Sequence, residues 1–186
     1  MSFLRNLEKV GVTIPQDYLQ PVEFIRGTCI IRQDEFGDGC YIIDEGTVRV
    51  ELVDRKTGKN IVLGSLEAGG VLGEFSFLDD KPRSASAYAD NHVKARWFSL
   101  QNFRKMCKDD PSIALSITLF LGQDLADKMR NLNQRIHDYI FTNDNDPKVR
   151  EILSPTFTPQ ESYDEATRDR ADTAVRMYGW GVFSGL

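Results

Sequence analysis

The spacing of apolar and polar residues changes twice along the chain. Apolar residues recur at helical spacing over residues 3–10, until Gly11 and Pro15 interrupt the run. From residue 22 to about 98, short β-rich pieces alternate with turn-forming stretches. The β-rich pieces include residues 29–31, 41–43, 48–53 and 61–63. The pattern predicts a short helix within residues 1–20, followed by a small antiparallel barrel or sandwich.

One β-rich piece shows the period of a half-buried strand. In residues 48–53, valine or leucine at positions 48, 50 and 52 alternates with Arg49, Glu51 and Val53. We therefore expect one face of this strand to lie against the core, with the charged side chains on the other face.

After Leu100 the spacing becomes helical again. Asp110 and Pro111 predict a break and a new helix, because proline suits a first helical turn and aspartate caps it. The segment from Ser112 to about Phe141 carries one narrow apolar stripe, formed by Leu121, Leu125, Met129, Leu132, Ile136 and Ile140. The stripe is expected to pack on the barrel or to pair with a second copy of the chain, and each half of the helix can do one of the two.

Residues 142–186 form an acidic tail with five basic and eight acidic residues, and an aromatic end at residues 178–183. Three alternatives stay open for this tail. It covers the protein's own pocket, it anchors a partner through its aromatic residues, or it is a disordered terminus.

Composition narrows the protein class. The chain has 186 residues, 41% hydrophobic and 27% charged, with a formal net charge of −5. This predicts a globular protein without the basic surface that nucleic acid needs. Because it has no apolar run of about 20 residues, no secretory signal and only three dispersed cysteines, we expect a cytoplasmic protein without membrane contact, metal or prosthetic group.

The stretch 69–87 (GGVLGEFSFLDDKPRSASA) carries the candidate chemistry. Gly73 permits a close backbone approach, and residues 74–78 can form one short helical turn with free amides. Arg83 can offer a two-pronged contact to a phosphate, and Ser84 with the amide of Ala85 adds donors. Glu74 suits a sugar hydroxyl of the same ligand. These residues predict a nucleotide site, although an ion pair between Glu74 and Arg83 in an empty pocket is the alternative.

Gly73 and Glu74, followed by Arg83, Ser84 and Ala85, resemble the phosphate-binding cassette of cyclic-nucleotide-binding domains. The resemblance covers roughly residues 15–141 and includes the stretches 30–33, 37–43 and 45–48. It implies an α+β fold, an eight-stranded antiparallel β-roll of jelly-roll type with an N-terminal helix and a long C-terminal helix. The implied domains are the helical segment 1–20, the binding domain 21–141 with helices over 100–141, and the tail 142–186.

The resemblance also implies residue roles. Glu74 would bind the ribose 2′-hydroxyl, and Arg83 the cyclic phosphate, with help from Ser84 and from backbone amides near Ser76 and Ala85. Phe75 belongs to the same cassette. Base contacts are expected on the long helix, with the candidates Lys128, Met129, Asn131 and Arg135.

Two turn positions depart from the family pattern: Asp34 replaces the usual glycine, and Gly70 replaces an acidic residue. The tail is also too short and acidic for a winged helix-turn-helix. We therefore expect a non-enzymatic sensor of cAMP, or of cGMP, which relays its signal through the long helix or the tail to a protein partner or within a homodimer formed by helix 112–141. The alternative is a nucleotide-free interaction module, its pocket filled by the tail or by Arg83.

Overall fold

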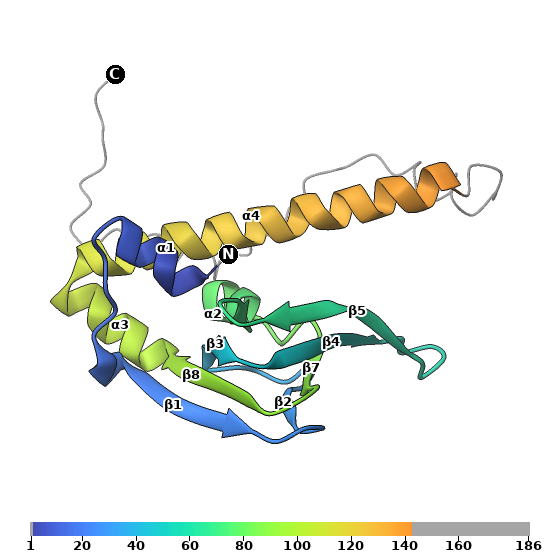
Figure 1. Cartoon of the computed structure of the whole chain (residues 1–186), viewed down its shortest axis with the longest axis horizontal. Coiled ribbons are helices and arrows are strands. Elements are labelled where there is room, and N and C mark those ends of the chain that lie inside the picture. Colours follow the sequence, from blue (N-terminus) through green and yellow to red (C-terminus); the bar gives the residue numbers. More distant parts are fainter. Residues whose placement is uncertain (1, 143–186) are drawn as a thin grey trace. The chain divides into compact units, whose positions relative to one another are not determined.

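The computed structural model describes residues 2–142, and it confirms the predicted eight-stranded antiparallel β-roll with flanking helices (Figure 1). The eight strands form two four-stranded sheets. The first sheet has the strand order β1 (Leu19–Phe24), β8 (Val93–Ser99), β3 (Gly39–Glu45), β6 (Val71–Leu72). The second has the order β2 (Cys29–Ile31), β7 (Ser86–Ala89), β4 (Thr47–Val53), β5 (Asn60–Glu67). The helices are α1 (Phe3–Lys9), the 3-10 turn η1 (Gln16–Tyr18), α2 (Glu74–Asp79), α3 (Leu100–Asp109) and α4 (Pro111–Thr142).

Strand β3 separates the two hydrophobic clusters of the fold because its side chains alternate between its two faces. Cys40 and Ile42 join the cluster under the helices, which includes Leu7 of α1, Met106 of α3, and Ile117 and Leu121 of α4. Ile43 joins the cluster inside the roll, between the two sheets, with Tyr41 packed against it. The first sheet therefore has one face toward the helices and one toward the interior of the roll.

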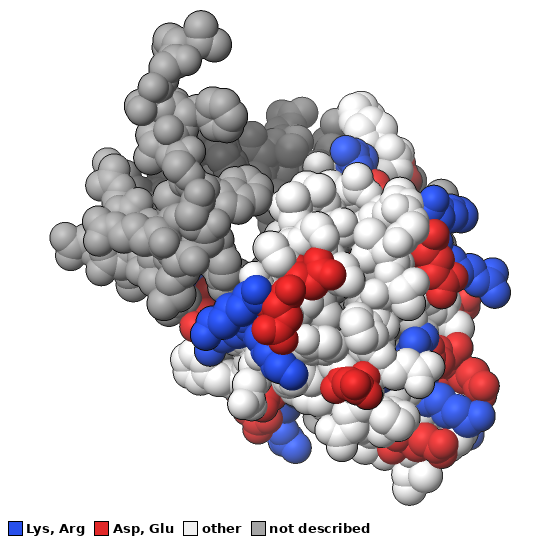
Figure 2. Space-filling model, turned by 90° about the vertical axis from the view of Figure 1, so that its left-hand side faces the viewer, with Lys and Arg blue, Asp and Glu red and all other residues white. Residues whose placement is uncertain are grey.

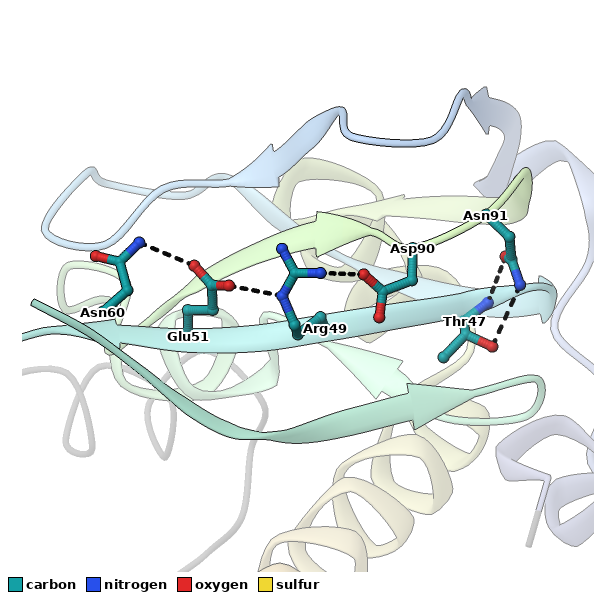
Figure 3. A network of polar contacts seen from close by, with 6 residues as sticks. All are labelled: Thr47, Arg49, Glu51, Asn60, Asp90 and Asn91. Atoms are coloured by element: carbon teal, nitrogen blue, oxygen red, sulfur yellow. Dashed lines mark hydrogen bonds and ion pairs between the residues drawn. The ribbon is translucent and has the colours of Figure 1, made fainter.

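Strand β4 follows the predicted alternation, but its charged face is less exposed than the pattern suggests. Val48 and Val50 pack in or on the interior cluster, whereas Arg49 and Glu51 lie on the opposite face. Figure 3 shows why Glu51 is buried: its carboxylate accepts hydrogen bonds from Arg49 Nε (2.6 Å) and Asn60 Nδ2 (3.1 Å), and Arg49 also pairs with Asp90. The ionic network itself covers the face that the sequence assigns to solvent.

Helices α3 and α4 meet at the predicted break. The Asp110 carboxylate accepts hydrogen bonds from the Ile113 amide (3.2 Å) and from Ser112 Oγ (2.6 Å), so it caps α4 as expected. These hydrogen bonds lower the pKa of Asp110, and the bond from Ser112 has the largest effect.

The apolar stripe of α4 divides along its length. Leu121 is buried in the cluster under the helices. Farther along the same stripe, Met129, Leu132 and Ile136 are 54%, 47% and 43% exposed. The chain divides into two compact units, residues 1–126 and 127–186, and this second part of α4 belongs to the second unit. The predicted tail lies outside the described residues, except for Thr142.

Opposite charges are interspersed on the described surface. Lys94 pairs with Glu45 (2.9 Å), and Arg96 pairs with Asp44 across neighbouring strands (2.5 Å). The face drawn in Figure 2 likewise has basic side chains beside acidic ones. Within residues 2–142, no helix has the length and apolar character needed to cross a membrane.

Candidate functional site

The predicted short helix in the cassette is α2, and Gly73 starts it. Gly73 has φ of 85°, in the left-handed region that side chains other than glycine rarely adopt. Glu74 and Ser76 of the first turn are buried, whereas Phe75 between them is 45% exposed. Ser76 Oγ has no hydrogen-bond partner among the described residues. The turn thus buries a carboxylate and an unsatisfied hydroxyl in the segment that the sequence marks as a ligand site.

Arg83 is the central side chain of the site. It is only 5% exposed, although it lies in an irregular segment between α2 and β7. Its guanidinium donates two hydrogen bonds to backbone carbonyl oxygens, from Nη1 to Gly73 (2.8 Å) and from Nη2 to Gly39 (2.8 Å). Within residues 2–142 it forms no ion pair. Arg83 is therefore a buried cation whose direct partners are neutral.

Two glycines make room for this guanidinium. A Cβ atom added at Gly37 would lie 2.1 Å from Arg83 Cζ, and one added at Gly73 would lie 2.3 Å from Nη1. Either distance is far shorter than a van der Waals contact allows. We call the space bounded by Gly37, Gly39 and Gly73 the Arg83 seat. The sequence indicates only a turn over residues 34–39. It therefore did not predict that Gly37 and Gly39 help to form the Arg83 seat.

Backbone hydrogen bonds join the Arg83 segment to the turn that supplies the seat. The Asp34 amide donates to the Arg83 carbonyl (2.9 Å), and the Arg83 amide donates to the Glu35 carbonyl (2.8 Å). Asp34 has φ of 68°, so it takes a conformation that favours glycine. The departure at this position therefore keeps the backbone shape that a glycine would have.

The electrostatic environment of Arg83 combines burial with the influence of four titratable side chains. Burial lowers the pKa of Arg83, and Tyr41, Cys40, Asp38 and Glu74 partly offset this effect, Tyr41 most. A buried guanidinium costs free energy unless an anion compensates it. The site is thus chemically suited to an anionic ligand group.

The remaining predicted ligand contacts fall in two places. Ser84 is exposed and Ala85 is buried, both directly after Arg83. The four candidate base contacts lie on α4 in the second compact unit. Lys128, Asn131 and Arg135 are spaced by three and four residues and share one helix face, whereas Met129 lies to the side of it. Their contact with a base stays a prediction.

Other candidate chemistry is sparse in the described part of the chain. Residues 2–142 contain no group of three or more His, Cys, Asp or Glu side chains arranged to hold a metal ion. Cys40 is buried, and Cys29 and Cys107 are half-buried.

Comparisons with known proteins find similar sequences. Residues 21–110 match the family model described as the cyclic nucleotide-binding domain. A cAMP-dependent protein kinase regulatory subunit from Dictyostelium discoideum is 34% identical over 109 residues, which cover 58% of this chain and 33% of that protein. A CRP-like cAMP-activated global transcriptional regulator from Mycobacterium tuberculosis is 32% identical over 143 residues, which cover 76% of this chain and 61% of that protein. The matches thus span between a third and about three fifths of these relatives.

Solved structures share the fold. A cyclic nucleotide-binding domain from Methylobacillus flagellatus aligns with a TM-score of 0.63 and 24% identity, covering 66% of this chain and 68% of that one. The catabolite activator protein of Thermus thermophilus aligns with a TM-score of 0.54 and 25% identity, covering 63% of this chain and 55% of that one. The β-roll, the glycine-started α2 and the buried Arg83 accompany this similarity, and the family match identifies a cyclic nucleotide-binding domain over residues 21–110 of the chain.

Proposed function

We propose that this protein is a sensor, without catalytic activity, that binds a 3′,5′-cyclic mononucleotide, with cAMP as the first candidate. The observation that carries the proposal is the buried Arg83 guanidinium, which has two neutral carbonyl partners and no ion pair within residues 2–142. A cyclic phosphate carries one negative charge at neutral pH, and the planar guanidinium suits its oxygens. One relative is a cAMP-dependent kinase regulatory subunit and the other a cAMP-activated regulator, which supports cAMP over other ligands.

In this proposal different cassette residues bind different parts of the nucleotide. Arg83 binds the phosphate, assisted by Ser84 and by the backbone at Ser76 and Ala85. Glu74 accepts a hydrogen bond from the ribose 2′-hydroxyl, and its burial at the start of α2 makes that bond strong. Gly73 and Phe75 frame the phosphate through their backbone.

The test is calorimetric titration of the protein with cAMP and with cGMP, beside Arg83→Ala. Removing one partner of a buried charged pair costs several kcal/mol, so we expect Arg83→Ala to weaken binding about a hundredfold or more. Glu74→Ala should weaken it less. Arg96→Ala is the matched control, because Arg96 pairs with Asp44 on another strand and should leave affinity unchanged.

The same titration distinguishes the sensor from the alternative, a nucleotide-free interaction module. That alternative predicts no heat with either nucleotide from a folded protein, because Arg83 keeps its seat permanently. The ratio of the cAMP and cGMP affinities gives the base preference.

We further propose that residues 21–141 bind the ligand and transmit the signal, with α4 joining two copies of the chain. Met129, Leu132 and Ile136 support this arrangement because they form one apolar stripe that is about half exposed in the single chain. Leu132→Glu combined with Ile136→Glu should convert a dimer to a monomer in sedimentation velocity, with Arg130→Glu as the control on another face of the helix. A monomeric wild-type protein at micromolar concentration would contradict the dimer and leave the helix or the tail as a site for a different protein.

A further inference from the structure

Tyr41 lies beside the Arg83 seat on the interior face of the roll. It follows Gly39 by two residues on β3, and the Gly39 carbonyl holds Arg83 Nη2. Since side chains alternate along a strand, Tyr41 lies on the same face as Ile43 and opposite to Cys40 and Ile42. Its side chain therefore belongs to the interior of the roll, at the end of β3 where Arg83 is held.

Aromatic neighbours fix the Tyr41 ring on both sides. The Trp97 ring lies 4.5 Å from it, centroid to centroid, and the Phe24 ring lies 5.6 Å away in an edge-on arrangement. Trp97 also packs over Gly39, where an added Cβ would lie 2.5 Å from its ring. The same indole thus holds the Tyr41 ring and the backbone residue that binds Arg83.

The hydroxyl of this fixed ring is unused. Tyr41 Oη forms no hydrogen bond with any residue between 2 and 142, although the side chain is only partly exposed. Burial raises the pKa of Tyr41, with Arg83 acting in the opposite direction, so the hydroxyl keeps its proton at neutral pH. A tyrosine in this state can donate a hydrogen bond as well as accept one. A protonated donor beside a buried cation is suited to an anion that contacts both.

We propose that Tyr41 is a further ligand-binding residue, whose hydroxyl donates a hydrogen bond to an exocyclic oxygen of the phosphate that Arg83 binds. This inference rests on the proposed function. Arg83 has five N–H donors and uses two of them on carbonyl oxygens, so donors remain for the ligand at this end of the roll. Tyr41 and Arg83 then hold the phosphate from the strand side and from the cassette side.

The test removes the hydroxyl and keeps the ring. Tyr41→Phe should retain the packing with Trp97 and Phe24, and it should weaken cAMP binding about tenfold or more, as for a hydrogen bond to a charged group. Tyr88→Phe is the matched control. The Arg49 guanidinium lies over the Tyr88 ring, and Tyr88 alternates with Ala87 and Ala89 of the interior cluster, so it lies on the outer face of the second sheet and the same change there should leave affinity unaltered. A thermal melt of each variant confirms that it is folded.

The two phosphorothioate diastereomers of cAMP then identify the contact atom, because sulfur replaces a different exocyclic oxygen in each and accepts hydrogen bonds poorly. The loss caused by Tyr41→Phe should persist with one diastereomer and largely vanish with the other. Equal losses with both, or wild-type affinity of Tyr41→Phe for cAMP, would overturn the inference while the proposed function stands. Failure of the wild-type protein to bind either nucleotide would overturn both.

Discussion

A single methyl group at Gly37 should separate the role of the Arg83 seat from the stability of the fold. In Gly37→Ala the new Cβ would lie 2.1 Å from Arg83 Cζ, so one of the two groups must move. Gly37 does not lie in the left-handed region, so alanine introduces no backbone strain. The guanidinium is the far end of a flexible side chain and is expected to leave its seat.

The hydrogen bonds of the Arg83 seat allow an estimate of how much Gly37→Ala changes stability and affinity. Each hydrogen bond from a charged donor contributes about 1.5–3 kcal/mol, so the two carbonyl contacts together hold the guanidinium by about 3–6 kcal/mol relative to an unbonded buried state. The displaced guanidinium regains hydration, which offsets most of that loss. We therefore expect the free energy of unfolding to fall by only about 1–2 kcal/mol. Affinity for cAMP should fall at least tenfold, because the cation no longer lies where the phosphate binds.

The assay is a double-mutant cycle read by urea unfolding and by calorimetric titration. It compares the wild-type protein with Gly37→Ala, Arg83→Ala and the double variant. Gly122→Ala is the control, since nothing lies within 4 Å of a Cβ at this position of α4, and it should raise stability by about 0.5–1 kcal/mol.

The double variant decides the matter. Without the Arg83 side chain the methyl group has room, so Gly37→Ala should cost close to nothing in the Arg83→Ala background. If it costs the same in both backgrounds, the methyl group acts on the backbone of the turn and not on the guanidinium, and the reasoning is refuted.

Three further predictions concern the turns and helix ends around the site. Asp34→Val should lower the free energy of unfolding by about 1–2 kcal/mol in chemical denaturation because φ is 68° there, whereas Asp34→Gly should leave it nearly unchanged. Asp110→Ala should lower the melting temperature at pH 7; because the folded-state pKa of Asp110 is lowered, that difference should be complete above its unfolded pKa and shrink as the pH falls through the folded value. Leu100→Pro removes the leucine side chain and also the amide that donates to the Asp38 carbonyl, at a first-turn position that tolerates proline. Relative to Leu100→Ala, it should reduce the ligand-induced change in hydrogen exchange of α3.

The roll, the glycine-started helix α2 and the break at Asp110 could be predicted because their signals are local. Alternating strands, a glycine before a short amphipathic turn, and Asp followed by Pro each act within a few residues. The resemblance to the family added the eight-stranded β-roll, where spacing alone left a barrel and a sandwich both open.

The Arg83 seat could not be predicted in the same way, because it depends on distant register. Gly39 and Arg83 are 44 residues apart, and their contact requires β3 to start at Gly39 and the cassette to be tied to residues 34–35. The burial of Glu51 has a similar origin: Asn60, which covers it, comes from the neighbouring strand. The position of a polar residue in an alternating pattern predicts which face of the sheet it lies on. Its exposure to solvent depends on the side chains that the neighbouring strand places beside it.

The turn 34–39 is the place where ligand binding and helix position can influence each other. Its residues contact Arg83 through the Glu35 carbonyl, the Gly37 backbone and the Gly39 carbonyl, and the Asp38 carbonyl between them accepts a hydrogen bond from the amide of Leu100 (2.6 Å), the first residue of α3. A phosphate bound to the guanidinium changes the strength of its hydrogen bond to the Gly39 carbonyl, and the neighbouring peptide units of the turn feel this change because they are covalently linked. A ligand shifts such an equilibrium only by its differential affinity for the two arrangements. The free energy held in the seat therefore sets an upper bound of a few kcal/mol on the signal that this turn can pass to α3.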